Sequence, residues 1–176
     1  MVADVGVQRS KDDMLLHAFE EVSAAVAERV ARIAREGTRH ERSIADVLTD
    51  ALDEHLPLDE PRRAEYRVVR SFAGRALDNP DLAGVEARTA ATLRAEIARA
   101  VRNGTECGEV EAGADVDTAA ARIAAVAEGL ATQVYRREAG AADRARDVLR
   151  AEVAAVFTSE CHQYDGGRPG QAVSRR

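Results

Sequence analysis

The chain has 176 residues, 45% of them hydrophobic, and this length and composition suit one domain with a buried core. Aromatic residues make up only 3%, so the core must come mainly from Ala, Val, Leu and Ile. The net charge of −6 makes the chain a poor binder of polyanions, and no apolar run approaches the roughly 18 residues that a membrane-spanning helix needs. We expect a soluble, cytoplasmic protein with no membrane partner.

The β-branched residues are scattered singly, which favours an all-α fold, a bundle of about six helices. The first predicted helix begins after Ser10, because Ser10 and Asp13 match the two polar positions of a capping box. Gly37 is predicted to end this helix. Its apolar face recurs at steps of three and four: Leu15, Phe19, Val22, Val26, Val30 and Ile33.

Three further helices follow. The second is predicted over residues 41–55 and is ended by Pro57, and Pro61 lies in the first turn of the third. Asn79 caps the fourth, which is predicted to end at Gly104. The apolar faces of these helices are Ile44, Val47, Leu48 and Leu52; Tyr66, Val69, Phe72, Ala73, Ala76 and Leu77; and Leu82, Val85, Thr89, Leu93, Ile97 and Val101.

Residues 104–115 contain three glycines and predict a loop. Asp115 then caps a fifth helix, and a sixth follows the break at residues 137–140. Their stripes are Val116, Ala120, Ile123, Ala127, Leu130 and Val134; and Ala145, Leu149, Val153, Val156 and Phe157. This regular seam is either an ordinary core within one chain or a two-helix contribution to a four-helix dimer interface.

The sequence lacks the patterns that are typical of catalytic and metal-binding sites. The four histidines are preceded at the third position by Met, Gly, Leu and Ser, so no Glu-x-x-His pattern of a di-iron bundle exists. The sequence also contains no HExxH, no phosphate-binding glycine motif and no GxSxG. Cys107 and Cys161 match no CxxC pattern and suggest a reduced setting. We expect no catalytic residue, no metal and no cofactor; metal in the purified protein would instead favour an enzyme.

Four stretches resemble TetR-family transcriptional regulators, over Gly6 to about Ser159. "SKDDMLLHAFEEV" from Ser10 resembles the junction that opens the long helix after the helix-turn-helix, and "VGVQ" before it resembles the end of a recognition helix. "AGRALDNPDLAGVEARTAATLRAEIARAVRNG" resembles the middle helices of the family. "AARIAAVAEGLATQVY" resembles its penultimate helix.

The resemblance implies a domain division. The three short helices of the DNA-reading head do not precede Ser10, so residues 1–9 are expected to be a remnant of that head or disordered. Residues 10–160 form the ligand-binding and dimerisation domain, and residues 161–176 a disordered tail. Of the phosphate contacts of the family, Ser10 and Lys11 remain, so DNA binding is expected to be compromised without an upstream helix-turn-helix.

The function implied is that of a regulator core, expected to repress, that forms a homodimer and binds a small-molecule effector. We expect Phe19, Tyr66, Phe72 and Leu93 to line the effector pocket, although core packing is the alternative for Tyr66 and Phe72. We expect Ile123, Leu130, Leu149 and Val153 to carry the dimer. An alternative is a headless helical dimer that does not bind DNA and is either a modulator or a relic. The sequence identifies neither the effector nor the operator.

Overall fold

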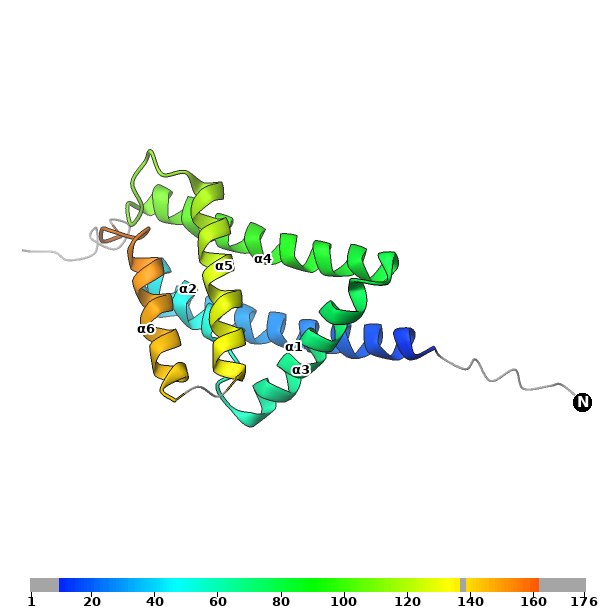
Figure 1. Cartoon of the computed structure of the whole chain (residues 1–176). Helices are drawn as coiled ribbons and strands as arrows, with labels where there is room; N and C mark the ends of the chain where they lie inside the picture. The colour runs from blue at the N-terminus through cyan, green and yellow to red at the C-terminus, as the bar shows by residue number, and fades with distance from the viewer. Residues whose placement is uncertain (1–9, 137–138, 162–176) are drawn as a thin grey trace, which may run out of the picture.

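The computed structural model describes residues 10–136 and 139–161, and these residues form a helical bundle, as predicted (Figure 1). The predicted remnant at 1–9 and nearly all of the tail at 161–176 lie outside the described residues. No helix of the described part is long and apolar enough to cross a membrane. The helices are α1 (Lys11–Arg39), α2 (Ile44–Asp53), α3 (Glu60–Ala76), α4 (Pro80–Cys107), α5 (Val116–Tyr135) and α6 (Ala141–Ala154).

The helix starts follow from local chemistry. The Ser10 hydroxyl accepts the Asp13 N–H at 3.0 Å and the Asp13 carboxylate accepts the Ser10 N–H at 3.0 Å, so the predicted capping box is present. Asn79 and Asp115 also cap their helices through side-chain oxygens, as predicted. These oxygens satisfy N–H groups that have no partner within the helix.

The helices pack around two hydrophobic clusters. The larger cluster joins α2, α4, α5 and α6, which contact one another, and α5 and α6 lie side by side (Figure 1). The smaller cluster lies where α1, α3 and α4 meet and is built on Phe19, Phe72, Ala76 and Leu82. The long helix α1 contacts both α2 and α3, so it links the two clusters.

Two predicted helix ends are wrong. Gly37 lies inside α1, which runs on to Arg39, and a Cβ on Gly37 would collide with the Val47 side chain. Gly104 lies inside α4, and a Cβ there would come within 2.7 Å of both Phe157 and Val110. Each glycine therefore permits a close approach of two segments. The residue that ends α4 is Gly108, at φ 97°, a left-handed conformation that favours glycine.

Two other predicted ranges are shorter in the structure. The second helix begins at Ile44, because Glu41 takes a left-handed conformation at φ 51° and Ser43 provides the cap. The sixth ends at Ala154, and Phe157 pairs instead with Val110 in an isolated antiparallel bridge. The bridge places the segment after α6 beside the turn that follows α4.

Candidate functional site

A cavity of about 1110 Å³ opens between the two hydrophobic clusters. Its walls come from α1, α3, α4 and α5, and the residues that follow α2 contribute to its lining. Apolar side chains such as Val22, Val26, Val69 and Leu93 form much of the surface. A cavity of this size that brings together apolar walls and a few polar groups is typical of a small-molecule site.

Three of the four residues predicted for the pocket line it, namely Phe19, Tyr66 and Leu93. The fourth, Phe72, does not. Its side chain is fully buried and stacks on Phe19, with ring centroids 4.0 Å apart and ring planes 10° apart. Phe72 therefore supports the wall from behind, as the core-packing alternative has it.

Tyr66 ties two walls of the cavity together. Its hydroxyl lies 2.9 Å from the Thr132 hydroxyl on α5, and its ring packs against Tyr135 with centroids 5.2 Å apart. One turn earlier on α3, Arg63 donates to the carbonyl oxygens of Val134 and Tyr135 at 3.2 and 2.6 Å. The end of α5 is thus anchored to α3, so the α3 wall and the α5 wall of the cavity are held together.

Arg29 of α1 neutralises two glutamates that line the cavity. Its guanidinium donates to Glu54 at 2.6 Å and to both carboxylate oxygens of Glu65 at 3.0 and 2.7 Å. Arg62 donates to the second oxygen of Glu54 at 2.8 Å. The hydrogen bond to Glu65 and the bond to Glu54 raise the pKa of Arg29 despite its partial burial. This network joins α1, α3 and the end of α2 on one side of the pocket.

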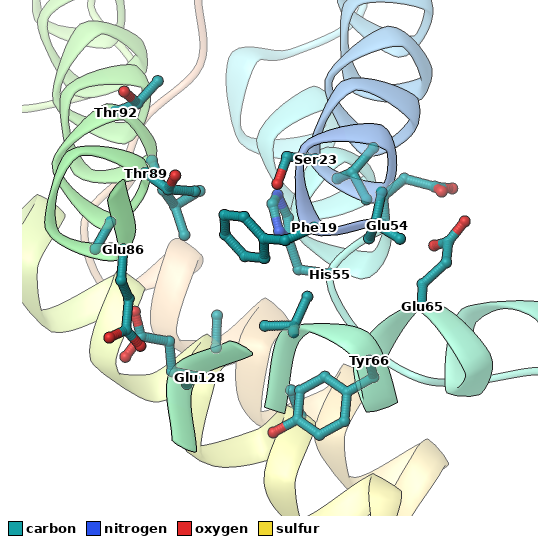
Figure 2. A pocket seen from close by; sticks show the side chains of 18 of the residues that line it. Phe19, Ser23, Glu54, His55, Glu65, Tyr66, Glu86, Thr89, Thr92 and Glu128 are labelled. Atoms are coloured by element: carbon teal, nitrogen blue, oxygen red, sulfur yellow. The ribbon is translucent and has the colours of Figure 1, made fainter. Parts of the chain in front are cut away.

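Three further glutamates that line the cavity have no such partner among the described residues: Glu86 and Glu96 of α4 and Glu128 of α5. Glu86 is half-buried, whereas Glu96 and Glu128 are exposed. Glu86 and Glu128 lie on the side away from Glu54 and Glu65 (Figure 2). The arginines that line the cavity besides Arg62 are Arg70 and Arg94, which are exposed.

His55 is a pocket residue that no sequence pattern marks. It follows α2 and its side chain points toward Ser23 and Phe19 (Figure 2). Burial lowers the pKa of His55; the Glu54 carboxylate opposes this shift and the Arg29 guanidinium adds to it. Because His55 lies beyond the end of its helix, no helical periodicity marks it as facing the cavity.

The comparisons with known proteins agree with this architecture. A family model described as the C-terminal part of BetI-type transcriptional repressors matches residues 44–158. The chain belongs to this TetR-type family. A transcriptional regulator from Rhodococcus sp. Rha1, whose crystal structure is known, is 25% identical, with a TM-score of 0.70 over 85% of this chain and 74% of that one. No curated protein matches the chain.

The other residues predicted from the TetR resemblance lie outside the cavity. Ser10 and Lys11 are exposed at the start of α1. The four residues expected to carry the dimer are all buried within the single chain, where Ile123 and Leu149 are 0% exposed. Val153 and Leu130 are 1% and 6% exposed. Their side chains belong to the larger core cluster, so little of their surface is left for a second copy.

Proposed function

We propose that this chain is the effector-binding and dimerising core of a TetR-family regulator. We further propose that its effector is an amphipathic small molecule that carries a positive charge. The observation that carries the proposal is the pair of glutamates, Glu86 and Glu128, that face a largely apolar cavity without a cationic partner in the described part of the chain.

The charge argument rests on the contrast between the two sides of the pocket. Glu54 and Glu65 are already neutralised by Arg29 and Arg62, so they offer little to a ligand. On the other side, a ligand that fills the cavity removes water from the half-buried Glu86 and from the cavity side of the exposed Glu128. Removing water from a carboxylate is costly unless a cation or a hydrogen-bond donor replaces it. An ammonium group provides both, whereas a ligand carboxylate would add repulsion.

The apolar part of the ligand has its own partners. Phe19 lies on the cavity wall and is held in place by Phe72, and Val22, Val69 and Leu93 add aliphatic surface. The hydroxyls of Thr89 and Thr92, on the same helix as Glu86, add weaker polar contacts (Figure 2). The ligand we propose therefore has a hydrophobic body and one cationic end.

The cavity is connected to the start of α1. Phe19 lies two turns after Asp12, which accepts hydrogen bonds from Arg75 at 2.8 and 3.0 Å and from Asn79 at 3.0 Å. A ligand that pushes on Phe19 would therefore act on a helix that is tied to α3 and to the cap of α4 near its beginning. Effector binding would favour one position of α1 over another, which is the two-state element that allosteric control needs.

Matched ligands test the proposal. Binding of hydrophobic ammonium compounds to the full chain, measured by calorimetry, should be detectable, and carboxylates of the same shape should bind at least about tenfold more weakly, a difference of about 1.4 kcal/mol. The Glu86→Gln and Glu128→Gln variants should each reduce ammonium affinity by about tenfold. Glu20→Gln, which changes an exposed glutamate of α1 outside the cavity, is the control. Equal binding of both ligand classes would contradict the proposal.

A further inference from the structure

A second group of reactive side chains lies away from the pocket, at the far end of α4. Cys107, Glu109 and Cys161 meet there, and one ligand atom from each lies within 4.8 Å of the other two. None of the three lines the cavity. Thiolates and carboxylates are the donors that zinc accepts in proteins, so this group raises the question of a metal site.

The fold brings these residues together by two local devices. Gly108 turns the chain back at the end of α4, and the N–H groups of Gly108 and Val110 both donate to the Gly104 carbonyl, at 2.9 and 3.1 Å. This turn places Cys107 and Glu109 on the same side.

The segment after α6 is held against that turn. Phe157 pairs with Val110 in the antiparallel bridge, and the Ser159 N–H donates to the Glu109 carbonyl at 3.2 Å. Cys161 follows two residues later and joins the group. Two parts of the chain that are far apart in sequence therefore converge on one point.

Glu109 is the most unusual member, because it is a carboxylate that is only 1% exposed. Its two oxygens accept the N–H groups of Ile44 and Ala45, at 2.9 and 3.0 Å, and so cap the start of α2. The positive end of the α2 dipole offsets part of its charge. No cationic side chain of the described residues forms an ion pair with it, and a buried carboxylate generally needs fuller compensation.

The Cys107 thiol lies beside Glu109, so a cation bound at this sulfur would also compensate the carboxylate. It is 4% exposed, and its sulfur lies 3.7 Å from Glu109 Oε1 and 3.6 Å from the Gly104 carbonyl oxygen. The S–H group is thus a weak donor to Glu109, and each carboxylate oxygen has a second lone pair to offer. A cation that replaced the thiol proton would contact the thiolate and Glu109 together.

We propose that Cys107, Glu109 and Cys161 form a binding site for a borderline-soft divalent cation, for which zinc is the natural choice. Two thiolates and one carboxylate give three of the four ligands of a tetrahedral site, and a water molecule completes it. Coordination by two thiolates releases one proton from each thiol. The ion would join the end of α4, the start of α2 and the segment after α6, and its fourth position would stay open to water.

Metal binding and proton loss are coupled at this site, because a divalent cation displaces the proton of each thiol that it coordinates. The geometry carries the site: the Cys107 sulfur lies 3.7 Å from Glu109 Oε1, and a ligand atom of Cys161 lies within 4.8 Å of both residues.

Titration of the reduced full chain with Co²⁺, a spectroscopic substitute for zinc, tests the site. We expect one equivalent to bind, with thiolate-to-cobalt charge-transfer absorption and the intense visible bands of tetrahedral cobalt, and we expect Zn²⁺ to displace it. Zn²⁺ should also raise the melting temperature, because it binds only the folded state. No thiolate charge-transfer band in the folded, reduced protein would overturn the proposal.

The variants separate this site from adventitious binding. Cys161→Ser should reduce Co²⁺ affinity at least about tenfold and weaken the charge-transfer band, and because Cys161 lies beyond the last helix it should leave the fold intact. Cys107→Ser should abolish the band, and circular dichroism checks that it folds. Glu111→Gln, an exposed neighbour, should bind like the wild type. Wild-type binding by the Cys161→Ser variant would overturn the assignment.

Discussion

The ring of Phe72 on α3 stacks on the ring of Phe19 on α1, with centroids 4.0 Å apart and planes 10° apart. Phe72 is fully buried, whereas Phe19 is 4% exposed and forms part of the cavity wall. The stack therefore couples the position of α3 to a residue of the cavity wall. Phe72 is also the largest fully buried side chain of the smaller cluster.

Phe72→Ala should lower the free energy of unfolding by about 3–5 kcal/mol, since it removes a buried ring and leaves a cavity behind Phe19. Phe72→Leu keeps more of the volume and should cost less, about 1–2 kcal/mol. Urea unfolding followed by circular dichroism measures both changes. Leu77→Ala, at a side chain that is 85% exposed, should change stability by less than about 0.5 kcal/mol. A Phe72→Ala variant as stable as this control would contradict the packing described.

The half-buried His55 predicts how stability depends on pH. Because burial lowers its pKa in the folded chain, the unfolded chain binds a proton at this residue at a higher pH than the folded chain does. Its contribution to the free energy of unfolding should therefore decrease as the pH falls below about 6.5, by no more than about 1.4 kcal/mol per pH unit.

The comparison is between the wild type and His55→Gln, unfolded in urea at several pH values between neutral and mildly acidic without a ligand. The variant should lose less stability than the wild type over this range, because glutamine does not titrate. Identical pH profiles would mean that His55 binds protons equally in the folded and unfolded chains.

The residues predicted to carry the dimer are buried within the chain, so the dimerisation proposed above would have to use the outward faces of α5 and α6. Val148 of α6 is a large hydrophobic residue that is 41% exposed beside the buried Leu149. Val148→Arg should convert a dimer into a monomer of 18.9 kDa, measured by light scattering after gel filtration. Leu77→Arg places the same change at the end of α3, away from this face, and should leave the dimer intact. A dimeric Val148→Arg variant would exclude this face.

Local sequence signals were sufficient for the helices themselves. The caps at Ser10, Asn79 and Asp115 and the steps of three and four in the apolar residues act within a few residues of chain. They predict the number and order of the helices and the periodic face of α5, whose Ala120, Ile123, Ala127, Leu130 and Val134 are all buried. They also place Phe19, Tyr66 and Leu93 on faces that turn toward one another in the pocket.

Contacts between segments that are distant in sequence decided the role of the two helix glycines, the partners of the α5 stripe and the surroundings of Glu109. A glycine looks the same in sequence whether it ends a helix or lets another segment approach, and Gly37 and Gly104 serve the second purpose because Val47 and Phe157 lie against them. An apolar stripe does not say which partner covers it, and α2, α4 and α6 cover the stripe of α5 within the chain. Glu109 shows the same principle, because only the folded chain brings it to the start of α2 and beside two cysteines with which it shares no sequence motif.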